Sequence, residues 1–85
     1  MKTIWKFPFE IADRVKITVP AGAKVRHVGL DPNDDPCLWC QVYSDAPKED
    51  LELFVVETGQ TIPKEAIEFL GSFMCGPFVW HVFTK

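Results

Sequence analysis

The reactive side chains of this 85-residue chain include three cysteines and two histidines. Cys37 and Cys40 have the Cys-x-x-Cys spacing that holds a metal or forms a redox disulfide on a turn or helix. The residues around them predict a strand, however, and side chains three apart on a strand point to opposite faces. We therefore expect Cys37, Cys40 and Cys75 to be apolar packing thiols, with no metal site and no cofactor.

Catalysis by a nucleophile would need the histidines. His27 and His81 both lie in apolar stretches that are typical of strands. A nucleophilic mechanism would also need Ser44, Ser72 or a cysteine beside one of them, together with an acid. No nucleophile motif marks such a group, and the glycines form no phosphate-binding loop. The sequence therefore predicts no catalytic residues and a protein that is not an enzyme.

A second set of residues could bind a nucleotide. Lys24 and Arg26 are two apart, so both should project from one face of a strand. Trp39 and Trp80 offer flat rings on which a base can stack, and cations beside such rings can hold a phosphate. Solvated cations and core tryptophans are the alternative. The predicted ligand contacts are Lys24, Arg26 and Trp80, followed by His27 and Trp39.

The elements that must position these residues are predicted to be strands separated by turns. Arg14–Val19 alternates strictly between polar and apolar residues, and Pro8 indicates an edge strand or a bulge. Pro63–Ala66 could form at most one helical turn. Asp31–Pro36, with three carboxylates and two prolines, should be a solvated loop. The predicted strands are Thr3–Glu10, Arg14–Val19, Lys24–Asp31, Cys37–Tyr43, Leu51–Glu57, Ile67–Met74 and Phe78–Thr84.

Seven short, mainly antiparallel strands predict an all-β fold, either a small sandwich or a partly open barrel. Residues 1–85 should form a single domain. The chain is 47% hydrophobic and holds seven Phe and three Trp, whereas a domain of this size buries only about 60–65% of its unfolded surface. We expect the first and last strands to be apolar on both faces, which predicts a homo-oligomer or a covering ligand.

Charge is distributed unevenly along the chain. Residues 1–26 carry six basic and two acidic residues, a net charge of +4, and residues 27–85 carry three basic and ten acidic residues, a net charge of −7. The overall charge of −3 argues against bulk nucleic acid as a partner. The basic part could hold a small anion, or the two parts could form ion pairs with each other.

Sequence features also predict the compartment. No stretch approaches the roughly 20 apolar residues of a membrane span, and the first residues lack the apolar region of a signal peptide. An odd number of cysteines suits a reducing environment. We therefore expect a cytoplasmic protein that does not bind membranes.

Several motifs follow one another along nearly the whole chain: Met1–Phe7, Pro20–Val25 with His27-Val28, Pro36–Trp39, Glu57–Gly59, Phe69–Phe73 and Phe78–Phe83. In this order they resemble a small family of uncharacterised phage and prophage proteins. The resemblance implies a setting in the host cytoplasm, where phage accessory proteins of this size often act by stoichiometric binding. We therefore expect a non-enzymatic, homo-oligomeric counter-defence protein that sequesters a small nucleotide-derived signal. The alternative is a protein that inhibits a host defence factor by direct contact, without a small ligand.

Overall fold

The computed structural model describes residues 1–85 as seven antiparallel strands and no helix. This confirms the predicted all-β fold, with two sheets that are not closed into a barrel. At the predicted helical turn, the chain makes one hydrogen-bonded turn, in which Ala66 N donates to Pro63 O at 3.1 Å. The strands are β1 (Lys2–Pro8), β2 (Arg14–Pro20), β3 (Lys24–Leu30), β4 (Pro36–Tyr43), β5 (Lys48–Glu57), β6 (Glu68–Cys75) and β7 (Phe78–Thr84).

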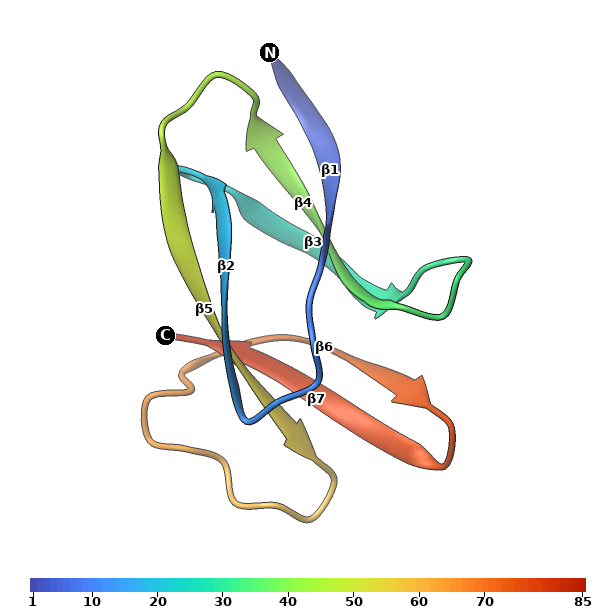
Figure 1. Cartoon of the computed structure of the whole chain (residues 1–85). Helices are drawn as coiled ribbons and strands as arrows, with labels where there is room; N and C mark the ends of the chain where they lie inside the picture. Colours follow the sequence, from blue (N-terminus) through green and yellow to red (C-terminus); the bar gives the residue numbers. More distant parts are fainter.

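The strands form a three-stranded sheet in the order β1-β4-β3 and a four-stranded sheet in the order β2-β5-β7-β6. The chain passes from one sheet to the other after β1, after β2 and after β4 (Figure 1). β1 lies at an edge, as Pro8 predicted, because proline has no N–H to donate to a second neighbour. The Cα atoms extend over 39 × 31 × 16 Å, and the shortest dimension fits two stacked sheets.

Both sheets contribute to one hydrophobic core. Along β4, the buried side chains Leu38, Cys40 and Val42 alternate with Trp39 and Gln41, which point away from the core. This alternation fixes which side chains of the three-stranded sheet can reach a ligand. The buried core residues are Phe9, Val28, Leu38, Cys40, Val42, Leu53, Val55, Phe73 and Val82.

Gly71 lets β6 of one sheet approach β3 of the other. Its φ of 156° lies where side chains are strained, and the pairing of β6 with β7 shifts between Phe69 and Gly71. A Cβ at this position would lie 3.1 Å from Cβ of Val28 on β3. The glycine therefore permits a close contact between the two sheets. Any other residue at this position would have to displace Val28.

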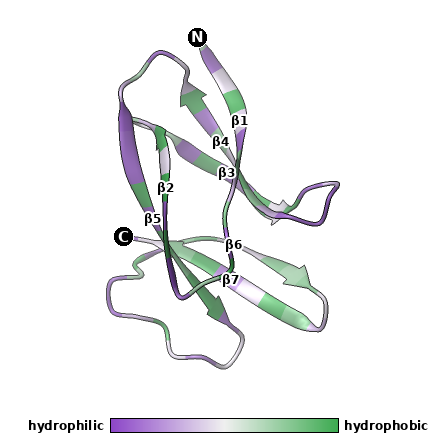
Figure 2. Cartoon of the chain, in the orientation of Figure 1, coloured by the Kyte–Doolittle hydropathy of each residue, from purple (hydrophilic) through white to green (hydrophobic).

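Two strands differ from the sequence predictions. β5 begins at Lys48 rather than Leu51, because its first residues pair with the end of β2, and Figure 2 shows this start as hydrophilic. β1 was expected to be apolar on both faces, but its burial alternates and only one face is consistently apolar. Thr3, Trp5 and Phe7 are half-buried, and Ile4 is the one large apolar side chain that the other side of β1 exposes.

Candidate functional site

The candidate site is the outer surface of the three-stranded sheet, here called the basic face and defined by Lys24, Arg26, His27, Trp39 and Gln41. Trp39 and Gln41 point outward from the central strand β4. On β3, His27 pairs in register with Trp39, and Lys24 pairs with Gln41. The structure thus brings together four of the five predicted ligand contacts, together with a glutamine that the sequence did not single out.

A β-bulge lets Arg26 and His27, neighbours in the sequence, both lie on this face. In the pairing of β3 with β4, Val25 lies opposite Cys40 and His27 lies opposite Trp39, so Arg26 is the extra residue. Its guanidinium donates from Nε and Nη2 to Oε1 of Gln41, at 3.3 and 3.0 Å. Lys24 and Arg26 share a face, as their two-residue spacing predicted, and the bulge adds His27, which strict alternation would have placed toward the core. The bond to Gln41 is what holds Arg26 there.

The two rings of the basic face lie against each other. The centroids of His27 and Trp39 are 5.3 Å apart, with an angle of 47° between the ring planes. The imidazole also lies over Gly29, because Nε2 of His27 is 2.9 Å from the point where a Cβ would stand. The absence of a side chain at Gly29 therefore lets the imidazole sit beside Trp39, where the two rings can support a third.

The cations of the three-stranded sheet differ in their partners. Nζ of Lys6 lies 2.9 Å from a carboxylate oxygen of Asp31, whereas Lys24 and Arg26 form no ion pair within the chain. Asp31 also accepts hydrogen bonds from the backbone N–H groups of Asn33 and Asp35. The prediction that this carboxylate is solvated was wrong, because these donors compensate its burial. The bond from Lys6, followed by the backbone bonds, lowers the pKa of Asp31.

A hollow lies where the two sheets meet beside the basic face. It measures about 460 Å³ and is here called the seam hollow. Three of its side chains are cationic and one is a carboxylate, while apolar residues form much of the rest. It is lined by Ala23, Lys24, Val25, Arg26, Leu51, Glu68, Leu70, Thr84 and Lys85. Lys24 and Arg26 thus belong both to the basic face and to this hollow.

The fifth predicted contact, Trp80, lies elsewhere. It belongs to β7 of the four-stranded sheet, pairs in register with the buried Phe73 and packs against the core. Its neighbour along the same face is Phe78, with ring centroids 6.0 Å apart. The structure therefore does not bring Trp80 to the basic face, and its position matches the core alternative that the sequence left open.

The Cys-x-x-Cys pair is buried and split between two faces. Cys40 belongs to the core, while Cys37 lies on the opposite face of the strand. Burial raises the pKa of the Cys40 thiol to about 11 and also raises the pKa of Cys37. Both are therefore protonated thiols at neutral pH. No three or more His, Cys, Asp or Glu residues cluster as metal ligands would, and no helix could cross a membrane.

A polar cluster on the four-stranded sheet joins Ser72 and His81, which were considered above, to Thr58, which the sequence did not single out. Ser72 Oγ lies 2.7 Å from Nδ1 of His81, and Thr58 Oγ1 lies 2.8 Å from Nε2. Thr58 donates to the carbonyl of Val79, so it accepts from Nε2–H, and Nδ1 accepts from Ser72. The tight turn at Gly76 was the available signal, because counting back from it pairs Ser72 with His81. Both ring nitrogens of His81 thus contact hydroxyl oxygens, whereas in a catalytic triad one of them contacts a carboxylate.

Comparison with known families adds a classification. A family model described as a domain of unknown function (DUF7352) matches residues 1–85. The chain belongs to this family. No curated protein and no solved structure matches the chain. The DUF7352 match thus covers both sheets and every residue of the basic face, and a function has to be argued from the geometry of the site.

Proposed function

We propose that this protein is a non-enzymatic binding protein whose basic face takes a small nucleotide-derived ligand. One observation carries the proposal. Two cations without carboxylate partners lie beside the paired rings of His27 and Trp39: Arg26, which donates to Gln41, and Lys24, which is opposite Gln41 in the strand pairing. A ring system joined to an anionic group is the ligand that this combination recognises best.

The polar groups of the face complement such a ligand. Oε1 of Gln41 accepts from Arg26, so the amide N–H groups of Gln41 are left to donate to a base or a ribose. The arginine retains donors for phosphate oxygens, which it binds in a forked geometry. Stacking of a base on an aromatic side chain contributes about 1–3 kcal/mol. Together these contacts suit binding without any chemical change to the ligand.

The biological role that we propose follows from the phage resemblance described above. A phage or prophage accessory protein with this face would act in the host cytoplasm by sequestering a nucleotide signal of a defence system. Homo-oligomerisation is part of the proposal. It is supported by exposed apolar side chains on β6 and just before it, where Phe69 is 56% and Ile67 is 74% exposed.

Calorimetry with a panel of cyclic dinucleotides, cyclic ADP-ribose isomers and nucleoside phosphates tests the proposal. We expect at least one compound to bind, and Trp39→Ala to weaken that binding about 5- to 100-fold through lost stacking. Phe78→Ala, which removes an exposed ring from the other sheet, is the matched control and should leave affinity unchanged. Absence of binding across the panel, or equal losses in the two variants, would contradict the proposal.

The second candidate function is inhibition of a host protein by direct contact. The exposed apolar side chains of β6, which include Phe69 and Met74, favour it. Native mass spectrometry of protein purified from phage-infected cells separates the two functions. A nucleotide retained by an oligomer supports sequestration, whereas a monomer bound to one host protein, without nucleotide, supports inhibition.

A further inference from the structure

We infer that the ligand carries a terminal phosphate, and that this phosphate occupies the seam hollow while the ring stacks on the basic face. The inference rests on the proposed function and specifies its ligand. It predicts a nucleoside with a free phosphate end rather than a cyclic phosphodiester.

Among the cations nearest the stacking rings, those on β3 are free and the one on β1 is paired. Trp39 has His27 as its neighbour on β3 and Lys6 as its neighbour on β1. The ammonium of Lys6 is neutralised by Asp31 at 2.9 Å, whereas Lys24 and Arg26 on β3 have no carboxylate partner. A ligand stacked at Trp39 would therefore place its anionic group toward β3. A second phosphate toward β1 would meet the paired Lys6, because the free Lys2 of β1 lies opposite Tyr43, four residues along β4 from Trp39.

The seam hollow opens at this β3 side. Lys24 and Arg26 line it, and its volume of about 460 Å³ lies within the range of about 300–1,000 Å³ that is usual for small-ligand sites. Val25, Leu51 and Leu70 form apolar parts of its wall, and a less polar surrounding strengthens attraction between charges. Since Arg26 reaches both Gln41 and the hollow, it connects the ring position to the phosphate position.

The number of free cations fits a terminal phosphate. Such a group carries about −1.5 to −2 charges at neutral pH, and each phosphate of a cyclic phosphodiester carries about one. The two cations from β3 match the larger value. The third cation, Lys85, lies 2.8 Å from Glu52, and the carboxylate of the hollow, Glu68, opposes an anion. Removing the charge of Glu68 should therefore improve binding of a terminal phosphate.

Isothermal calorimetry with nucleosides, nucleoside 5′-monophosphates and 3′,5′-cyclic monophosphates, in adenine and guanine series, tests the inference. We expect the 5′-monophosphate to bind at least tenfold more tightly than the cyclic form, and the nucleoside to bind most weakly. Leu70→Trp, which fills the hollow, should reduce the affinity of the monophosphate toward that of the nucleoside. Glu68→Gln changes an exposed residue and should raise monophosphate affinity about two- to fivefold, with no effect on the nucleoside.

The outcomes separate the inference from the proposed function. If nucleotides bind through Trp39 but the monophosphate has no advantage, or Glu68→Gln changes nothing, the inference is wrong and the proposed function stands. If none of the probes here and none of the cyclic ligands above bind, both are wrong. Should Leu70→Trp fail to fold, Glu68→Gln still decides, because its side chain lies at the surface.

Discussion

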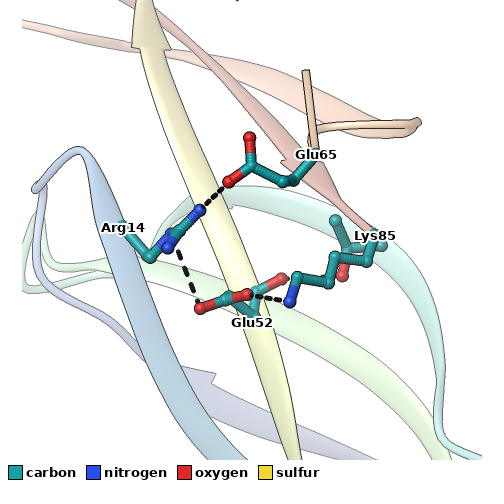
Figure 3. Close-up of polar contacts among 5 residues, drawn as sticks. Arg14, Glu52, Glu65 and Lys85 are labelled. Carbon is teal, nitrogen blue, oxygen red and sulfur yellow. Dashed lines mark hydrogen bonds and ion pairs between the residues drawn. The ribbon is translucent and has the colours of Figure 1, made fainter. Parts of the chain in front are cut away.

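The two arginines of the chain lie on different sheets and have different kinds of partner. On the four-stranded sheet, Arg14 pairs with Glu65 and lies 3.6 Å from Glu52, which also pairs with Lys85 at 2.8 Å (Figure 3). On the basic face, Arg26 has only the neutral Gln41 as a partner. The basic residues of the N-terminal part are therefore divided between charges that the fold uses and charges that are free for a ligand.

The carboxylates that pair with these cations have lowered pKa values. The bond from Lys85 lowers the pKa of Glu52, and a backbone hydrogen bond followed by Arg14 lowers the pKa of Glu65. On the three-stranded sheet, only Asp31 behaves similarly, and it is occupied by Lys6. Exposed ion pairs such as that of Arg14 contribute little to stability. Their clearest consequence is that they leave the four-stranded sheet without a free arginine.

The largest predicted effect is a loss of stability, caused by a substitution in the core that both sheets share. Leu38→Ala should destabilise the protein by about 2–5 kcal/mol, because it leaves a cavity among fully buried side chains. Urea unfolding followed by far-UV circular dichroism and by tryptophan fluorescence should show one coincident transition, shifted to lower urea. Two separate transitions would mean that the sheets unfold independently, and would contradict a shared core.

The next effect compares the two arginines directly. Arg26→Ala should weaken nucleotide binding about 10- to 100-fold, because charge-assisted hydrogen bonds contribute about 1.5–3 kcal/mol. Arg14→Ala removes the same side chain from the four-stranded sheet, where it is already paired, and should change affinity less than about twofold. Titration calorimetry measures both. Equal losses would show that overall charge, rather than the basic face, governs binding.

Much of the fold could be predicted because its signals are local. The alternation of β2 and the turn residues between strands depend on neighbours in sequence, so all seven strands were found. The bulge at Arg26 depends on how β3 pairs with β4, and no local signal marks it. The burial of Asp31 depends on Lys6, which is 25 residues away. For the same reason, the sequence could not show that Trp80 packs against the core.

A smaller effect concerns pH. The folded-state pKa of Asp31 lies below its ordinary value of 3.8, so the ionised carboxylate stabilises the fold above that value. This contribution is lost as the pH falls through the lowered pKa. Asp31→Asn should therefore be less stable than the parent protein at neutral pH, and the difference should shrink below pH 4. Urea midpoints at pH 7, 5 and 3.5 measure it, with Glu10→Gln, which changes an exposed carboxylate that forms no ion pair, as control. A difference that is constant with pH would contradict the assignment.

The smallest effect isolates the geometry of the basic face. In Gly29→Ala, the new methyl group would lie 2.9 Å from Nε2 of His27, so the imidazole must move away from Trp39. We expect nucleotide affinity to fall about two- to fivefold, since such ring contacts contribute about 0.5–1.5 kcal/mol, with little change in stability. In a His27→Ala background the same substitution should have no further effect, because the displaced ring is absent. Additive losses in this cycle would show that Gly29 acts on the ligand by another route than the imidazole.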